Sequence, residues 1–180
     1  MRSSPMDDRP SSHAALLQRA REAAGGSQGP AERLQTICRL LRDGLEGYDW
    51  VGFYLVDPAA DRSLVLGPYE GEPTEHTRIP FGRGICGQAA ERGETVVVDD
   101  VSQESNYLAC STAVQSEIVV PVYHGGSLVG ELDIDSHRSA RFGPEDRAFV
   151  EAVAGVSAPL VAALAAQESG CRSGTNGLHG

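Results

Sequence analysis

Residues 117–135 read EIVVPVYHGGSLVGELDID, and this stretch decides the fold of the chain. Two apolar runs rich in β-branched residues flank Gly125-Gly126. A two-glycine turn is typical of a tight β-hairpin, because glycine adopts positive φ at little steric cost. We therefore expect two antiparallel strands, over 117–124 and 128–135, joined at the glycines.

Four shorter runs extend the expected sheet on the N-terminal side of the hairpin. They cover residues 49–56, 63–67, 76–79 and 94–98. Helices are expected over 13–24, 30–46 and 85–92, and over 144–167 with an interruption at Pro159. Because most neighbouring strands join by tight turns, the pattern predicts the α+β class, with a central, mostly antiparallel sheet flanked by helices. We expect one domain over 13–167, a disordered N-terminus over 1–12 and a flexible tail over 168–180.

The overall composition narrows the classes of partner. The chain has 180 residues, of which 41% are hydrophobic, and a formal net charge of −10. A negative charge argues against nucleic acid or an anionic membrane surface as the main partner. No stretch is expected to cross a bilayer, which takes about 20 apolar residues, and the N-terminus lacks the apolar core of a secretory signal. We therefore expect a cytoplasmic protein in a reducing compartment, with neither nucleic acid nor membrane as partner.

The four cysteines of the chain are expected to be free thiols. No CxxC pair is present, which argues against a structural zinc site. Cys38 lies beside an apolar helical stripe and is expected to be a small buried hydrophobe, whereas Cys171 lies in the tail and is expected to be incidental. Cys86 begins a short helix, and both the helix N-terminus and the nearby Arg83 would stabilise a thiolate there. Cys110 lies in a long polar loop, and such loops are often functional. Thiol redox chemistry at Cys86 and Cys110 is therefore expected.

The strand over 49–56 carries two aromatic side chains on one face. Strand alternation places Trp50, Gly52 and Tyr54 together, and the missing side chain at Gly52 would leave space between the rings for a ligand. The alternative is that both rings pack in a core, as most strand aromatics do.

The second strand of the hairpin carries three carboxylates. Glu131, Asp133 and Asp135 share one face of the second strand. Two aspartates this close repel each other, so one would hold its proton near neutral pH, and such a pair can donate a proton or bind a cationic amine. Glu117 on the partner strand would join them in one acidic pocket. The alternative is a solvated edge of the sheet, with Glu117 as an exposed gatekeeper.

Six short motifs occur in an order that resembles one enzyme family. They are WVGFYL (50–55), LGPY (66–69), IPFGRGICG (79–87), LAC (108–110), SEIVVP (116–121) and LDIDS (132–136). Over roughly residues 30–160 the chain resembles the free methionine-(R)-sulfoxide reductases, enzymes built on a GAF domain. The resemblance implies a GAF-like fold and reduction of free L-methionine-(R)-sulfoxide without a cofactor or metal.

The resemblance also implies roles for two cysteines. A thiolate attacks the sulfoxide sulfur, an acid protonates the departing oxygen, and methionine leaves behind a cysteine sulfenic acid. A second thiol condenses with it to a disulfide, which thioredoxin reduces. By position Cys110 matches the nucleophile and Cys86 the resolving thiol. The residues taken alone slightly favour the opposite order, since Cys86 has the helix N-terminus.

The same resemblance implies the substrate pocket. Trp50 and Tyr54 would cradle the thioether and methyl group. Glu117, Asp133 and Asp135 would hold the amine and protonate the sulfoxide oxygen. A methionine within a polypeptide lacks the free amine that this pocket requires.

Two positions depart from the family pattern. His76 stands where some members carry a third cysteine, so a two-cysteine cycle is required, and His76 is expected to be an ordinary strand residue. In the loop, Ser111 stands where the family often has aspartate, and Ser105-Asn106-Tyr107 replaces the more usual glycine and histidine.

Two functions without catalysis compete with this interpretation. One is a regulatory GAF module that binds a small ligand; against it, no output domain is expected, and the acids would repel the phosphate of a cyclic nucleotide. The other is a redox sensor whose disulfide is the signal. The oligomeric state stays open, although GAF domains often dimerise and the apolar helices at both ends offer a homodimer interface.

Overall fold

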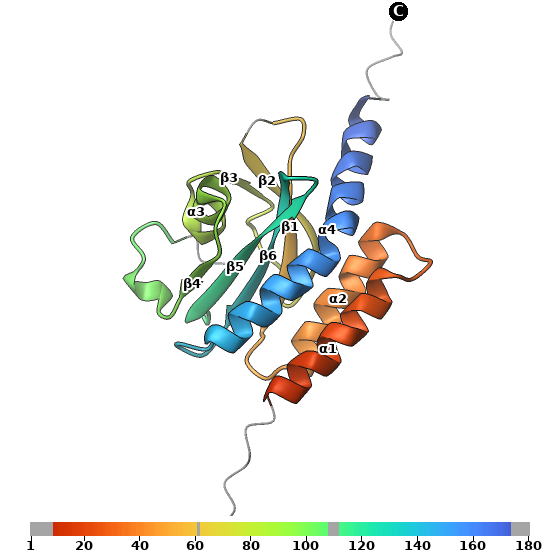
Figure 1. Ribbon diagram of the computed structural model, residues 1–180. Coiled ribbons are helices and arrows are strands. Elements are labelled where there is room, and N and C mark those ends of the chain that lie inside the picture. Colours follow the sequence, from red (N-terminus) through yellow and green to blue (C-terminus); the bar gives the residue numbers. More distant parts are fainter. Residues whose placement is uncertain (1–8, 61, 108–111, 174–180) are drawn as a thin grey trace, which may run out of the picture.

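The computed structural model describes residues 9–60, 62–107 and 112–173, except for the side chains of 9–11 and 171–173. Figure 1 shows the helices and strands. They are α1 (Arg9–Ala24), α2 (Pro30–Gly44), β1 (Trp50–Val56), β2 (Ser63–Glu70), β3 (Arg78–Pro80), α3 (Gly84–Arg92), β4 (Val96–Val98), the 3-10 helix η1 (Val101–Gln103), β5 (Ser116–His124), β6 (Ser127–Ser136) and α4 (Pro144–Ser173).

The described strands form one six-stranded sheet in the order β3-β2-β1-β6-β5-β4. Every neighbouring pair is antiparallel, which confirms the predicted α+β class with an antiparallel sheet flanked by helices. β5 and β6 are the predicted hairpin, and Gly125 and Gly126 at its turn both have positive φ, of 59° and 80°. β1 and β6 pair at the centre of the sheet, so each has side chains buried on both faces.

The two faces of the sheet carry different cores. α1, α2 and α4 cover one face, and α3 lies over the other (Figure 1). On β1, Val51, Phe53 and Leu55 pack on the three-helix side, whereas Trp50 and Tyr54 pack on the α3 side. The predicted alternation along β1 is therefore confirmed, and the α3 side of the sheet carries the residues with reactive or charged groups.

Both ends of the described chain are more helical than expected. α1 begins at Arg9, so the expectation of disorder over 1–12 is wrong for residues 9–12, while residues 1–8 lie outside the described ranges. α4 continues to Ser173, so the first part of the expected tail is also helical.

α4 continues without interruption through Pro159, contrary to expectation. The carbonyl that Pro159 leaves without an N–H donor belongs to Gly155; both residues are exposed, so water can satisfy that carbonyl. Contrary to the expectation from sequence, the helix is also apolar enough by composition to cross a membrane, since a window within Pro144–Gly170 has a mean hydropathy of 1.9. Half of that window is buried inside the protein, and burial against the sheet accounts for its composition as a core helix.

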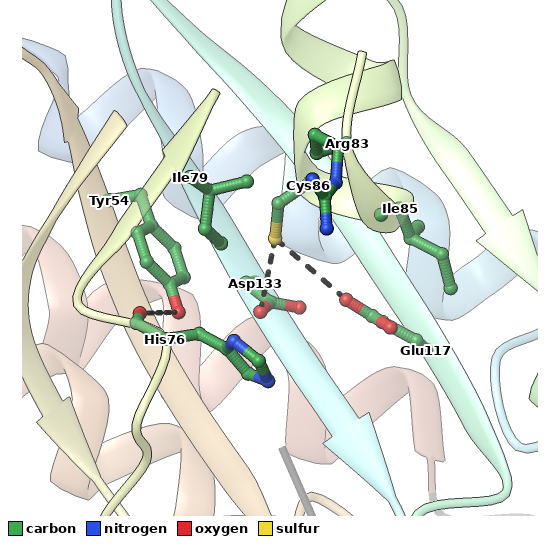
Figure 2. Close-up of a pocket in the computed structure, with 9 residues that line it drawn as sticks. Tyr54, His76, Ile79, Arg83, Ile85, Cys86, Glu117 and Asp133 are labelled. Atoms are coloured by element: carbon green, nitrogen blue, oxygen red, sulfur yellow. Dashed lines mark hydrogen bonds between the residues drawn. The ribbon is translucent and has the colours of Figure 1, made fainter. Parts of the chain in front are cut away.

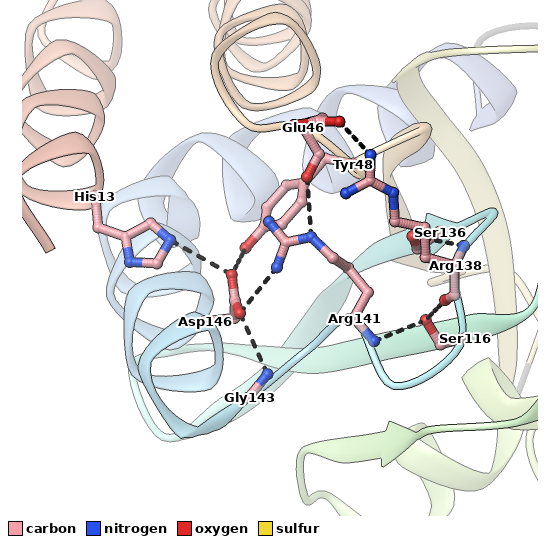
Figure 3. Close-up of polar contacts among 9 residues, drawn as sticks. All are labelled: His13, Glu46, Tyr48, Ser116, Ser136, Arg138, Arg141, Gly143 and Asp146. Atoms are coloured by element: carbon pink, nitrogen blue, oxygen red, sulfur yellow. Dashed lines mark hydrogen bonds and ion pairs between the residues drawn. The ribbon is translucent and has the colours of Figure 1, made fainter. Parts of the chain in front are cut away.

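A buried polar cluster ties α1, α4 and the segment before β1 together (Figure 3). Asp146, in the first turn of α4, accepts hydrogen bonds from Tyr48 Oη at 2.8 Å and from Arg141 Nη1 at 3.0 Å. The backbone N–H of Gly143 donates a third bond at 3.2 Å. His13 of α1 brings Nε2 to 3.4 Å from the same carboxylate. This carboxylate therefore connects segments that are far apart in the sequence.

We expect Asp146→Ala to lower the free energy of unfolding by about 3–5 kcal/mol, the range for breaking a buried ion pair. The physical reason is Arg141, whose side chain is only 11% exposed and would keep an unpaired charge. Chemical denaturation followed by circular dichroism measures the loss. Glu91→Ala removes a half-exposed pair with Arg62 and is the control, with an expected cost below about 1 kcal/mol. Equal costs for the two variants would contradict the structural role of Asp146.

Candidate functional site

Helix α3 places Cys86 against the sheet. The chain enters the helix at Gly84, whose φ of 63° favours glycine. One turn later, a Cβ at Gly87 would lie 2.5 Å from the carbonyl oxygen of Pro80 in β3, so only glycine allows the helix this close to the strand. Cys86 is consequently 5% exposed and faces the central strands.

Cys86 points toward two carboxylates of the central hairpin (Figure 2). Its Sγ lies 3.3 Å from Oδ2 of Asp133 in β6 and 3.8 Å from Oε1 of Glu117 in β5. The hairpin register pairs Glu117 with Asp135, which lies two residues along β6 from Asp133 and on the same face. Pairing of the strands therefore brings acids from two separate motifs to one thiol.

The surroundings of Cys86 oppose its ionisation. Burial raises the pKa of the Cys86 thiol well above its usual value, and the negative charges of the nearby carboxylates, Asp133 foremost, raise this pKa further. A helix N-terminus is worth only about 0.3–1 kcal/mol at typical sites, whereas burial shifts a pKa by up to several units. The expectation that the helix and Arg83 would stabilise a thiolate is therefore wrong, and Cys86 is a protonated thiol that donates to Asp133.

Three acids of β6 are buried on the same face. Glu131, Asp133 and Asp135 are each at most 1% exposed, so they do not form a solvated edge. Burial raises the pKa of Asp133 to about 6. Burial, followed by the charge of Asp133, also raises the pKa values of Glu131 and Asp135 well above the ordinary range. The expectation that one of these acids holds its proton near neutral pH agrees with these pKa shifts.

Several oxygens of these acids lack hydrogen bonds within the described part of the chain. They are both carboxylate oxygens of Glu131, both of Asp135, and Oδ1 of Asp133. Buried carboxylates without partners are costly to a fold. A row of buried carboxylates without hydrogen-bond partners is suited to bind a proton or a cation.

The two predicted aromatics occupy this face, but not as expected. Tyr54 is fully buried, and its Oη donates a hydrogen bond to the carbonyl oxygen of His76 at 3.0 Å (Figure 2). Trp50 stacks on Tyr69 with ring centroids 5.4 Å apart. A Cβ at Gly52 would lie 2.3 Å from the Trp50 ring, so the indole itself fills the space above Gly52. The expectation of ligand space at Gly52 is therefore wrong.

The expected site residues line two separate hollows. The first, of about 10 Å³, is lined by Tyr54, His76, Ile79, Arg83, Gly84, Ile85, Cys86, Glu117 and Asp133. The second, of about 130 Å³, is lined by Arg42, Asp49, Trp50, Glu72, Val114, Asp135 and His137. Trp50 and Asp135 are register partners on neighbouring strands, next to Gly52 and Asp133, so the two hollows lie side by side.

Known proteins share this architecture. A family model described as GAF domain matches residues 27–161. Free methionine-R-sulfoxide reductase from Escherichia coli (strain K12) is 42% identical over 113 residues, which are 63% of this chain and 66% of that protein. Protein YtsP from Bacillus subtilis is 43% identical over 111 residues, 62% of this chain and 67% of that protein.

A solved structure covers more of the chain. The X-ray structure of free methionine-R-sulfoxide reductase from Neisseria meningitidis in complex with its substrate matches with a TM-score of 0.80 and 34% identity, over 94% of this chain and 98% of that one. This chain belongs to the free methionine-R-sulfoxide reductase family of GAF-domain proteins. The recognition from six short motifs is thereby confirmed.

Within this GAF domain, reasoning from sequence missed three features of the site. Glu131 was grouped with the aspartates only by strand face, yet it is fully buried and its charge acts on Cys86. His76 precedes β3 instead of lying in a strand, and it lines the hollow beside Cys86. Asn106 donates from Nδ2 to the carbonyl of Gly82 at 2.8 Å and so ties its loop to the entry of α3. No sequence period marks a loop contact of this kind.

The other three cysteines of this family member differ in how far the structure describes them. Cys38 is fully buried with its Sγ 3.5 Å from the carbonyl oxygen of Pro68, and burial raises its thiol pKa, so the predicted role as a small buried hydrophobe is confirmed. Cys110 and Ser111 lie outside the described residues. Cys171 lies in α4, in the part whose side chains are not described.

Proposed function

We propose that this chain reduces free L-methionine-(R)-sulfoxide to methionine with cysteine thiols. The observation that carries the proposal is the buried Cys86 thiol, held 3.3 Å from Asp133 and 3.8 Å from Glu117. A domain that only binds a regulatory ligand has no need of a thiol facing two carboxylates. The Neisseria meningitidis protein, 34% identical and named for this activity, supports the same conclusion.

Recognition of a free amino acid follows from the buried charges. The ammonium group of the substrate would bind along the acids of β6, whose unpartnered oxygens then gain a cation. Arg42, which lines the second hollow with Asp135, supplies a positive charge for the substrate carboxylate. Tyr54 and Trp50 offer apolar surface to the methyl and thioether carbons. A peptide-bound methionine sulfoxide lacks both charges and is excluded.

In the first chemical step, Cys110 acts as the nucleophile. Its thiolate attacks the sulfoxide sulfur, the sulfoxide oxygen takes a proton and passes to the cysteine, and methionine leaves. The products are methionine and the Cys110 sulfenic acid. Asp133, with a pKa raised by burial to about 6, is poised to exchange protons near neutral pH.

The second step uses Cys86. Its proton passes to Asp133 Oδ2, 3.3 Å away. The resulting thiolate attacks the sulfenic sulfur of Cys110, hydroxide leaves and takes up a proton as water, and a disulfide joins the two cysteines. A dithiol protein of the thioredoxin type then reduces the disulfide in a cytoplasmic, reducing compartment. The raised pKa of Cys86 fits a thiol that reacts only after substrate chemistry has begun.

The described residues on either side of Cys110 pack on the same core as Cys86. On one side Tyr107 packs against the α3-side core, three residues before Cys110, and three residues span at most about 11 Å. On the other side Val114 is buried in the same core. The described residues on both sides of the segment that contains Cys110 therefore pack on the core that contains Cys86.

The proposal predicts reductant consumption with one epimer of one substrate. With thioredoxin, thioredoxin reductase and NADPH, the protein is expected to oxidise NADPH when given free L-methionine-(R)-sulfoxide. The S epimer is expected to react at least about 100-fold more slowly, because with its amine and carboxylate bound the inverted sulfur directs the oxygen away from the proton donor. A blocked N-acetyl methionine-(R)-sulfoxide amide is expected to be at least as poor, because a buried site built for a charged group rejects analogues that lack it. No turnover with the R epimer of the free amino acid would refute the proposed function.

A further inference from the structure

Three ligating atoms of the site meet at one point between α3, β5 and β6. Cys86, Glu117 and Asp133 form a group of potential metal ligands in which one ligand atom from each residue lies within 4.8 Å of the others. The sulfur lies 3.3 Å from the Asp133 oxygen and 3.8 Å from the Glu117 oxygen. In tetrahedral zinc sites, bonds of about 2.3 Å to sulfur and about 2.0–2.2 Å to oxygen separate those ligands by about 3.5 Å. The observed distances bracket that value.

A second observation also points to a cation at this place. Asp133 is 1% exposed, and its other oxygen, Oδ1, has no hydrogen-bond partner among the described residues. Glu131 is fully buried, its charge acts on Cys86, and neither of its oxygens has such a partner. The hollow bounded by Cys86 measures about 10 Å³, which is room for about one water molecule and hence for a single ion.

We propose that the reduced protein binds one zinc-like divalent cation at Cys86, Glu117 and Asp133, with water in the fourth position. On binding, the Cys86 thiol releases its proton to solvent and its sulfur forms a bond to the ion, with no change in oxidation state. This site differs from a structural zinc site, against which the cysteine spacing argues, because it uses one thiolate and two carboxylates from three elements.

Metal binding at this point would regulate the reaction. A coordinated Cys86 sulfur is not free to attack a sulfenic acid, and Asp133 can no longer accept its proton. The ion would also neutralise the carboxylate charge to which the substrate ammonium binds. Zinc therefore acts as an inhibitor, and a chelator that removes the zinc restores activity. This inhibition rests on the proposed function, whereas the metal binding itself does not.

Cobalt(II) substitution tests the binding directly. The full chain, reduced and freed of metal by a chelator, is titrated with Co²⁺ under anaerobic conditions. We expect one Co²⁺ per chain, a thiolate-to-cobalt charge-transfer band, and the intense visible bands of a four-coordinate ion. Added Zn²⁺ should remove these bands, because similar sites prefer zinc over cobalt.

Conservative variants identify the ligands. Cys86→Ser is expected to lose the charge-transfer band, while Asp133→Asn and Glu117→Gln should weaken binding by at least about tenfold, since even outer-shell substitutions cost that much. Cys38→Ser is the matched control, because Cys38 is equally buried and its sulfur is 3.5 Å from a carbonyl of Pro68. Cys38→Ser should keep the spectrum. Circular dichroism establishes that each variant is folded.

The outcomes separate the site from the reaction. No tetrahedral cobalt spectrum in the wild-type chain, or a charge-transfer band that survives Cys86→Ser, would overturn the metal site. Turnover of free methionine sulfoxide that stays unchanged at saturating Zn²⁺ would overturn the inhibition alone. A cobalt spectrum that follows Cys86 in a protein without any reductase activity would leave the site standing and refute the proposed function.

Discussion

Cys110→Ser is expected to release no methionine from free methionine sulfoxide, whereas Cys86→Ser releases about one equivalent and then stops. The reason is the effect of the site on the ionisation of Cys86. Cys86 is buried against carboxylates that raise its pKa, which disfavours the thiolate that the first attack requires. Without Cys110 no other step can begin. Without Cys86 the sulfenic acid forms but cannot close to a disulfide.

Single-turnover experiments measure this difference. Each variant is pre-reduced, separated from reductant, and mixed with excess substrate; released methionine is quantified per chain. Mass spectrometry should detect a sulfenic acid adduct on Cys110 in Cys86→Ser. Cys38→Ser is the control with an expected full turnover, because its sulfur lies on the far face of the sheet from the site. If Cys86→Ser abolishes the first release and Cys110→Ser keeps it, the two roles are reversed.

Asp133→Asn is expected to lower turnover by at least about 100-fold and yet to make the protein more stable at pH 8. The catalytic loss follows because the amide neither donates a proton to the sulfoxide oxygen nor accepts the Cys86 proton, and general acid–base groups contribute about 10²–10⁴-fold. Asp135→Asn is also expected to lose turnover by orders of magnitude with the fold intact. Near-normal activity in both variants would contradict the proposed roles.

The gain in stability follows from the direction of the pKa shift. Burial raises the pKa of Asp133 from 3.8 to about 6, so the folded protein binds this proton more tightly than the unfolded chain. The contribution of the group is therefore fully present below about pH 4 and is lost as pH rises through about 6. Two units correspond to about 3 kcal/mol, which is an upper estimate of the gain on replacing the carboxylate with an amide that does not ionise.

Thermal melts of wild type and Asp133→Asn at pH 4, 6 and 8 check this gain. The difference in melting temperature should grow from pH 4 to pH 8. Asp57→Asn is the matched control, because Asp57 is 4% exposed but has partners, namely the ion pair with Arg78 and the N–H of Ala59 at 2.9 Å. This control is expected to lose stability. A loss of similar size in Asp133→Asn would show that the site carboxylate contributes to folding and imposes no strain on it.

Much of the site was predictable because strand pairing obeys a period of two. Alternation alone placed Glu131, Asp133 and Asp135 on one face, and the Gly-Gly turn predicted that Glu117 would lie on the partner strand. Both statements need only the direction of successive Cβ atoms. The irregular segments were less accessible, because His76 and Asn106 reach the site through loops that no period describes.

The side-chain environment, by contrast, depended on packing between elements distant in sequence. Gly52 suggested empty space, but the Trp50 indole turns over it, since Tyr69 of β2 offers a stacking surface there. The ends of the chain also differ from the expectation because of packing. Residues 9–12 and 168–173 carry weak local signals. The polar start of α1 is tolerated in a helix that packs on α2 and α4, and Pro159 is tolerated in α4, which packs on the sheet.

The sequence by itself determined the hairpin, the two faces of the sheet, the family and the set of reactive groups, because these depend on local periodicity and on residue types at fixed spacing. Only the tertiary structure decided the state of Cys86. Sequence neighbours predicted a thiolate stabilised by a helix N-terminus and Arg83, whereas β5 and β6 bring carboxylates to within 3.3 and 3.8 Å of the sulfur in a buried pocket. Burial and like charge outweigh the helix dipole, so the ionisation of this thiol is set by groups 31 and 47 residues away along the chain.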